Sequence, residues 1–147
     1  DISSKKNIIK NADILLLEGW CCGSPSINKK YLFQNINRLE TIFDKNKKWR
    51  QYYNYQLKKD YKKVFSLFDQ QIYIQPPSFS YIIKWRYAQE KNNALKSKNK
   101  DFMNKKDLQK FIQHYEKLTK WMMKTMPAKA DILIKIDSNQ KIKKVVI

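Results

Sequence analysis

The sequence predicts a single α/β domain, spanning residues 1–147, that is built on a mostly parallel β-sheet. Residues 14–17 form an uninterrupted aliphatic run, which is typical of a strand buried on both faces of a parallel sheet. Segments with helical periodicity separate this run from two further strand-like segments, residues 71–75 and 131–137. These connections are long enough for the right-handed crossovers that parallel strands require.

The composition indicates a globular protein with a strong positive charge. Of the 147 residues 42% are apolar and 14% aromatic, and no apolar run reaches the roughly 18 residues of a membrane span. The net charge of +18 is compatible with a basic nucleic-acid-binding module. However, the chain has 28 lysines spread along its length and only three arginines, whereas base and phosphate recognition favours arginine. Nucleic acid is therefore the less favoured partner, and attraction to anionic ligands such as nucleotides is expected.

The two cysteines, Cys21 and Cys22, are adjacent in the sequence. This spacing is typical neither of a zinc site nor of a redox pair, and His114 is the only histidine. We expect no Cys/His metal site and a reducing, cytoplasmic environment.

The first predicted strand, residues 13–19, ends at an acidic residue and a glycine. Glu18 lies at the carboxyl end of this strand, where ligands bind in open parallel sheets. The only two glycines of the chain, Gly19 and Gly23, follow at once. Their backbone freedom suits a loop that approaches a ligand closely, although an ordinary turn after a core strand fits equally well.

Helical periodicity predicts a short helix over residues 31–44 and a longer one over residues 49–68. The longer helix carries an aromatic stripe that could stack on a base, but packing against the sheet is the favoured interpretation. Its members recur at three- and four-residue spacing: Trp49, Tyr53, Leu57, Tyr61, Val64, Phe65 and Phe68.

The second half of the chain repeats the alternation of strand and helix. A second strand over residues 71–75 ends at two prolines, and a helix is expected over residues 79–95. The lysine- and asparagine-rich residues 91–101 are predicted to be exposed and mobile. A helix with one apolar face follows, beginning near Asn104 and ending near Lys124. A third strand over residues 131–137 and a short last strand over residues 143–147 complete the chain.

The three arginines are informative because lysine is the default cation of this chain. Arg38, Arg50 and Arg86 are expected where a planar fork of donors is needed, for a ligand or for a carboxylate of the protein. Arg86 has a structural partner available in Glu90, one helical turn further on.

Several short motifs occur in an order that resembles the D-glycerate 3-kinase family of P-loop kinases. The similarity spans residues 13–137. The motifs are Glu18-Gly19-Trp20-Cys21-Cys22-Gly23, Arg38-Leu39-Glu40, Trp49-Arg50-Gln51-Tyr52-Tyr53-Asn54, Pro77-Ser78-Phe79, Trp85-Arg86-Tyr87-Ala88-Gln89-Glu90, His114-Tyr115-Glu116-Lys117-Leu118-Thr119 and Met126-Pro127.

The resemblance implies a three-layer P-loop NTPase-type domain that transfers the γ-phosphoryl group of ATP to a small hydroxylated acceptor, with D-glycerate as the first candidate. Glu18 would help to hold Mg²⁺, directly or through water, and Arg86 would close over the phosphates as a lid. Trp20, Arg50 and Asn54 fall where the acceptor-side loops of this family lie. Where relatives tend to have an arginine, this chain has Lys117, which offers a point charge in place of a fork.

One departure from the family is large, because the chain contains no Gly-x-x-x-x-Gly-Lys-[Ser/Thr] phosphate-binding loop. The resemblance therefore implies the C-terminal part of a kinase, inactive as an isolated chain, with a missing N-terminal segment as a partner. The strand that carries the phosphate loop would lie between the first two strands predicted here, so a gap and exposed sheet edges are expected. A degenerate kinase fragment without activity is the alternative within the same family.

Overall fold

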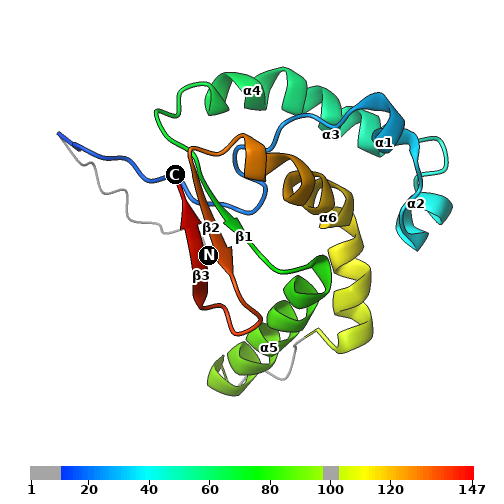
Figure 1. Ribbon diagram of the computed structural model, residues 1–147. Coiled ribbons are helices and arrows are strands. Elements are labelled where there is room, and N and C mark those ends of the chain that lie inside the picture. The colour runs from blue at the N-terminus through cyan, green and yellow to red at the C-terminus, as the bar shows by residue number, and fades with distance from the viewer. Residues whose placement is uncertain (1–10, 98–102) are drawn as a thin grey trace.

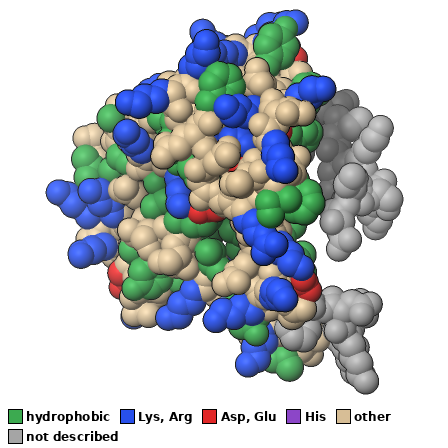
Figure 2. All heavy atoms as spheres, turned by 90° about the vertical axis from the view of Figure 1, so that its right-hand side faces the viewer, with side chains coloured by type: hydrophobic (Ala, Val, Ile, Leu, Met, Phe, Trp, Pro, Cys, Tyr) green, Lys and Arg blue, Asp and Glu red, His purple; other side chains and the backbone are tan. Residues whose placement is uncertain are grey.

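The computed structural model describes residues 11–97 and 103–147. In this part of the chain a three-stranded sheet lies beside six α-helices and one short 3₁₀ helix (Figure 1). The architecture is mixed α/β, as the sequence predicts. Lysine and arginine side chains are scattered over the face shown in Figure 2, among apolar and neutral side chains.

The sheet has the order β1 (Ile72–Gln75), β2 (Ile132–Ile136) and β3 (Ile142–Val146). β1 and β2 are parallel, whereas β2 and β3 are antiparallel, so the prediction of a mostly parallel sheet is wrong. The reason is the tight turn between β2 and β3. Asp137 holds this turn by accepting hydrogen bonds from the backbone N–H groups of Asn139 and Lys141, at 2.8 and 2.9 Å. A connection this short can only join antiparallel strands.

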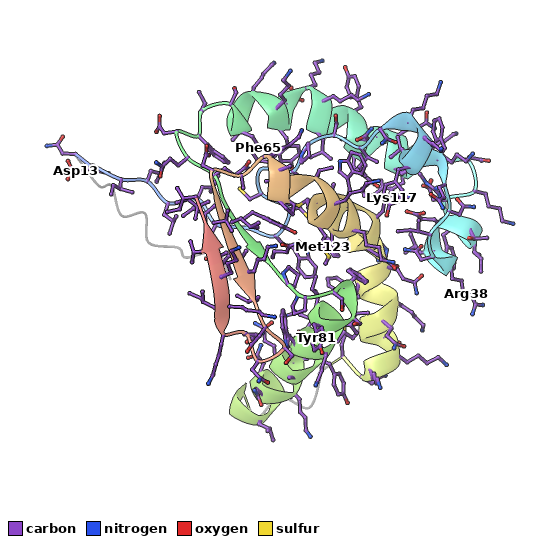
Figure 3. All side chains as sticks on the ribbon, viewed as in Figure 1. Asp13, Arg38, Phe65, Tyr81, Lys117 and Met123 are labelled. Atoms are coloured by element: carbon purple, nitrogen blue, oxygen red, sulfur yellow. The ribbon has the colours of Figure 1, made fainter. Side chains whose placement is uncertain are left out.

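The predicted first strand, residues 13–19, does not form. The segment is extended, belongs to no sheet, and exposes its aliphatic side chains: Leu15 is 90% and Leu17 is 55% exposed. Asp13 lies near the outer end of this segment, away from the helices (Figure 3). A strand needs a neighbour for its backbone hydrogen bonds, and no described strand pairs with this one.

The helices between this segment and the sheet are shorter than predicted. In place of the helix predicted over residues 31–44 there are α1 (Lys29–Phe33) and α2 (Arg38–Ile42). In place of the helix predicted over residues 49–68 there are α3 (Lys48–Lys58) and α4 (Asp60–Phe65). Asparagine caps explain the first two, because the side chains of Asn28 and Asn37 accept hydrogen bonds from the N–H groups of Tyr31 and Glu40.

The later helices agree better with the sequence. α5 covers Phe79–Ser97 and α6 covers Lys105–Thr125, followed by the 3₁₀ helix η1 at Met126–Ala128. The side chain of Asn104 caps α6 by accepting from the N–H groups of Lys106 and Asp107. Residues 91–97 are helical, not an irregular segment, and residues 98–101 of that prediction lie outside the described residues.

α6 is the centre of the hydrophobic core. Leu108, Ile112 and Met122 on one of its faces are buried, together with Met126 of η1 and Leu133 of β2. Trp121 ties α6 to the first loop by donating to the carbonyl oxygen of Ser26 at 3.2 Å. Figure 1 shows α6 between the sheet and the layer formed by α3 and α4.

Candidate functional site

An apolar cavity of about 650 Å³ opens between the extended N-terminal segment and helices α3, α4 and α6. Most of the aromatic stripe predicted to pack on the sheet lines this cavity instead. The lining residues are Leu17, Glu18, Trp20, Cys21, Cys22, Trp49, Tyr53, Leu57, Tyr61, Val64, Phe65, Phe111, His114, Tyr115 and Leu118. In Figure 3, Phe65 points from α4 toward the interior of the molecule. The cavity is the candidate functional site.

The structure brings two predicted site residues, Glu18 and Trp20, to this cavity. Glu18 is exposed and is the only carboxylate among the lining residues that the structure describes. The indole N–H of Trp20 donates to the hydroxyl of Thr119 at 2.9 Å, and its ring stacks on Tyr115 with 5.3 Å between centroids. A rigid aromatic wall on α6 thus holds the loop that follows Glu18.

Burial keeps two groups of the cavity, the thiol of Cys21 and the phenol of Tyr53, protonated. Desolvation raises the pKa of Cys21 to about 12, although a hydrogen bond with Thr119 opposes the shift. Desolvation and the nearby Glu40 carboxylate also raise the pKa of Tyr53 well above its usual value. The thiol is therefore a poor nucleophile at neutral pH. His114 contacts the carbonyl oxygen of Phe111 through Nδ1 at 3.0 Å.

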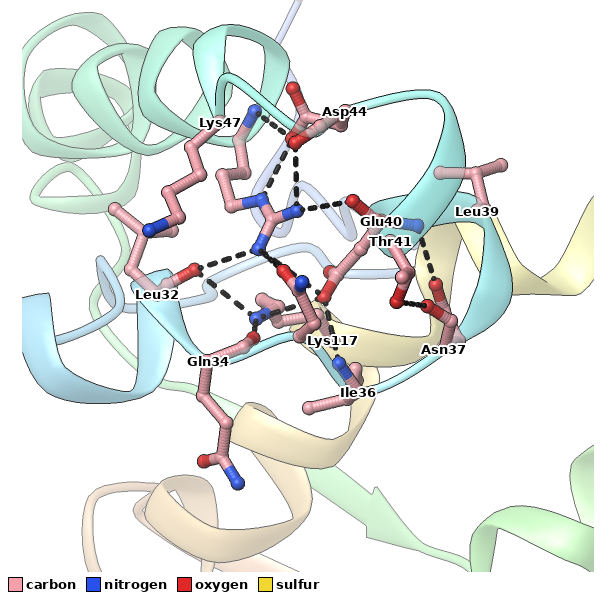
Figure 4. Close-up of polar contacts among 12 residues, drawn as sticks. Leu32, Gln34, Ile36, Asn37, Leu39, Glu40, Thr41, Asp44, Lys47 and Lys117 are labelled. Atoms are coloured by element: carbon pink, nitrogen blue, oxygen red, sulfur yellow. Dashed lines mark hydrogen bonds and ion pairs between the residues drawn. The ribbon is translucent and has the colours of Figure 1, made fainter.

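Arg50 and Asn54 lie in the interior, where protein groups occupy their polar atoms. Arg50 is 1% exposed, and its Nε donates to Asp44 at 2.7 Å (Figure 4). Its two terminal nitrogens donate to Asn35 and to backbone carbonyls, including that of Glu40. The acceptor-binding role of Arg50 stays a prediction, and these contacts favour a structural role instead.

The polar atoms of the Asn54 side chain are likewise hydrogen-bonded within the protein. Its amide group binds both backbone polar groups of Ile27, accepting from the N–H at 2.6 Å and donating to the carbonyl oxygen at 3.0 Å. The side chain thus fixes the loop before α1. Its acceptor-binding role also stays a prediction.

Arg86 lies on α5 and is not among the residues that line the cavity. Its guanidinium forms an ion pair with Glu90 at 2.5 Å and a hydrogen bond with Gln89 at 2.7 Å. The structural partner named from the sequence is therefore present. Glu18 and Arg86 are not brought together in this structure, and the lid role of Arg86 stays a prediction.

Lys117 takes a role that sequence reasoning missed. Its ammonium group is buried between α6 and α1, where it donates to the carbonyl oxygens of Tyr31, Leu32 and Gln34 and pairs with Glu40 at 3.1 Å (Figure 4). Burial lowers the pKa of Lys117, although the Glu40 carboxylate opposes that shift. A point charge suits this site, because three carbonyls converge on one nitrogen.

The sequence also did not single out Tyr115 and Thr119 as partners of Trp20. The sequence pattern that could have identified them is the four-residue spacing of Phe111, Tyr115 and Thr119, which places all three on one face of α6. In the structure Phe111 and Tyr115 line the cavity, and Thr119 binds Trp20 in the loop after Glu18.

The described residues contain no group of three or more His, Cys, Asp or Glu side chains that could hold a metal ion. A single exposed carboxylate such as Glu18 still fits the way in which Mg²⁺ is usually bound beside phosphates. There, one or two carboxylates and several waters complete the coordination sphere. No helix within the described ranges is long and apolar enough to cross a membrane.

The α/β arrangement of helices and sheet is similar to a kinase fold. The chain is similar to D-glycerate 3-kinase from Cryptococcus neoformans var. grubii serotype A, with a TM-score of 0.66 and 18% sequence identity over 95% of this chain and 51% of that one. It is also similar to the YGR205w protein, with a TM-score of 0.56 and 16% identity over 87% of this chain and 45% of that one.

The likeness at this level of identity is one of fold. The chain spans about half the length of each of these two solved structures. No protein-family model and no curated protein sequence matches it.

Proposed function

We propose that this chain is part of an ATP-dependent kinase that phosphorylates a small hydroxylated acceptor, with D-glycerate as the first candidate. The observation that carries the proposal is the fold similarity to D-glycerate 3-kinase over 95% of the chain. The motifs that resemble the family lie along the same part of the chain, and one of them places Glu18 at the rim of the apolar cavity.

Glu18 is the proposed anchor for Mg²⁺, directly or through water. When bound, the metal ion would neutralise charge on the transferring phosphoryl group. Trp20 anchors the loop beyond Glu18 through its contacts with Thr119 and Tyr115. The apolar lining of the cavity would exclude the water that competes with the acceptor hydroxyl.

Arg86 is the proposed lid residue. In this role its guanidinium would have to leave Glu90 and Gln89, which are its present partners. Because the Arg86 side chain is 29% exposed, it is accessible for such an exchange. A phosphate could accept from both terminal nitrogens of the guanidinium, which now bind Glu90 and Gln89 separately.

The test compares two carboxylate variants of the protein as its gene encodes it, with ATP, Mg²⁺ and D-glycerate. We expect Glu18→Gln to lower ATP-dependent turnover by about 10- to 100-fold, because an orienting ligand of the metal ion is lost. Asp13→Asn is the matched control, since Asp13 is exposed on the same extended segment and does not line the cavity.

Turnover should stay within about twofold in the Asp13 control. Equal turnover in the Glu18 variant and the native protein would remove Glu18 from the site. Absence of both ATP binding and turnover in the native protein would support the inactive-fragment alternative.

A further inference from the structure

One face of α3 carries tyrosines and lysines and no acidic group. Lys48, Tyr52, Tyr55 and Lys58 recur at three- and four-residue spacing, which places them on one side of the helix. The buried residues of α3 lie on its other side. Residues 45–59 contain no aspartate and no glutamate. We call Lys48, Tyr52, Tyr55 and Lys58 the tyrosine face.

The two tyrosine rings of this face are open to solvent. Tyr52 is 57% and Tyr55 is 53% exposed, and neither lines the apolar cavity. Tyr52 stacks on Trp49 with 6.0 Å between ring centroids, and Nζ of Lys59 lies 5.4 Å from the ring centroid of Tyr55. One exposed aromatic side chain needs no explanation, but two neighbouring rings among cations are typical of a surface on which bases stack.

A basic cleft adjoins the carboxyl end of the tyrosine face. Its volume is about 560 Å³, and Lys58 lines it together with Lys62 of α4 and with Lys129, which follows η1. Serine side chains also line the cleft, and no carboxylate is among its described lining residues. In the described part of the chain, none of the three lysines forms an ion pair. Lysines that converge without a counter-charge favour the binding of an anion.

We propose that the tyrosine face and the basic cleft bind a single-stranded nucleic acid without preference for its base sequence. Bases of the strand would stack on Tyr52 and Tyr55, and its phosphates would pair with Lys48, Lys58 and the other lysines of the cleft. The net charge of +18 would attract the strand. The inference rests on these surface residues and not on the proposed kinase activity.

The residue types on this surface decide which kind of nucleic acid fits it. Arginine is the residue that most often reads base edges, and neither the tyrosine face nor the basic cleft contains one. Lysine pairs as a point charge with a phosphate whatever the base is. A tyrosine ring can stack only on a base that is not stacked in a duplex. The surface therefore suits a single strand of any sequence.

The first test measures the affinity of the protein, as its gene encodes it, for a labelled oligouridine of about 12 nucleotides by fluorescence anisotropy. We expect Tyr52→Ala and Tyr55→Ala each to weaken binding about five- to 100-fold, because a stacked base is lost. Tyr52→Phe and Tyr55→Phe are the matched controls, since they keep the ring, and should stay within about twofold of the native affinity. Both side chains are exposed, and circular dichroism should show that all four variants fold.

The second test separates this surface from the general charge of the chain. Lys58→Ala and Lys144→Ala each remove one positive charge, but Lys144 is exposed on β3, away from α3 (Figure 1). Affinity measured against salt concentration should show a logarithmic slope that is shallower by about 0.7 in Lys58→Ala, because one phosphate contact is lost. Lys144→Ala should keep the slope of the native protein.

The inference is overturned if the native protein does not bind the oligouridine, if both alanine variants of the tyrosines keep its affinity, or if the phenylalanine variants lose as much as the alanine variants. Equal changes of slope in the two lysine variants, or tighter binding of an RNA duplex of the same length, would also overturn it. Binding as described by a protein without ATP-dependent turnover would contradict the proposed function and leave this inference intact.

Discussion

At the scale of single residues, Gly23 shows that a glycine beside a candidate site can be required by packing within the protein. The sequence associates the two glycines with close approach to a ligand, whereas Gly23 closely approaches a side chain of the protein. A Cβ atom at Gly23 would lie 1.5 Å from Nε2 of Gln71, and its φ of 73° is one that other residues rarely adopt.

We therefore expect Gly23→Ala to lower the free energy of unfolding by about 1–3 kcal/mol, from backbone strain and displacement of Gln71. Gly19→Ala is the matched control, since the nearest atom to its added Cβ is 3.7 Å away. Urea denaturation of both variants measures the difference. Equal stability of the two variants would contradict the packing described for Gly23.

Glu18, Trp20 and Arg50 show how far the positions of the candidate residues could be predicted from the sequence. Glu18 and Trp20 reach the same cavity because they are two positions apart on a loop that Thr119 holds. Arg50 was singled out because arginine is rare in this chain. The rarity of arginine indicates that forked hydrogen bonds are needed at this position, but it does not tell whether a ligand or the protein accepts them. That target is inside the protein, where Asp44 and Glu40 accept from the guanidinium or pair with it.

At the scale of elements, Asp44 joins the end of α2 to the start of α3. Its carboxylate accepts from the backbone N–H groups of Trp49 and Arg50 and from Nε of Arg50. Burial acts to raise the pKa of Asp44, but these hydrogen bonds outweigh it and hold the pKa below its usual value. The ionised carboxylate is therefore a stabilising feature of the first turn of α3.

A carboxyl whose pKa is lowered by folding contributes stability above its unfolded pKa of about 3.9, and this contribution is lost as the pH falls further. We expect Asp44→Asn to cost about 3 kcal/mol at pH 7, because the buried Arg50 loses its closest anion. The difference from the native protein should shrink as the pH falls below about 4.

Asp69→Asn serves as the control, because Asp69 is exposed. Denaturant titrations between pH 7 and pH 3 measure both variants. A difference for Asp44→Asn that is independent of pH would show that the effect is not due to the ionised carboxylate.

The elements differ in how well their own residues specify them. β1 and α6 are close to their predicted bounds because prolines, an asparagine cap and a continuous apolar face mark them. Residues 49–68 form two helices because the backbone breaks at Lys59, where no proline or glycine marks the break. Residues 13–19 do not form a strand because strand pairing depends on a neighbour, which a local pattern cannot supply.

At the scale of the whole molecule, the fold is a kinase-like α/β arrangement in which the described helices lie on one side of the sheet. The antiparallel β3 and the unpaired residues 14–17 depart from the mostly parallel sheet predicted from the sequence. Because the first predicted strand does not form, the gap predicted between it and β1 stays a prediction.

The most direct test of the central claim is phosphorus NMR of the protein, as its gene encodes it, incubated with ATP, Mg²⁺ and D-glycerate. The account predicts that the γ-phosphate signal of ATP falls while the signals of ADP and a phosphoglycerate rise in equal amounts. Unchanged ATP in the presence of folded protein, or loss of ATP to inorganic phosphate alone, would contradict it.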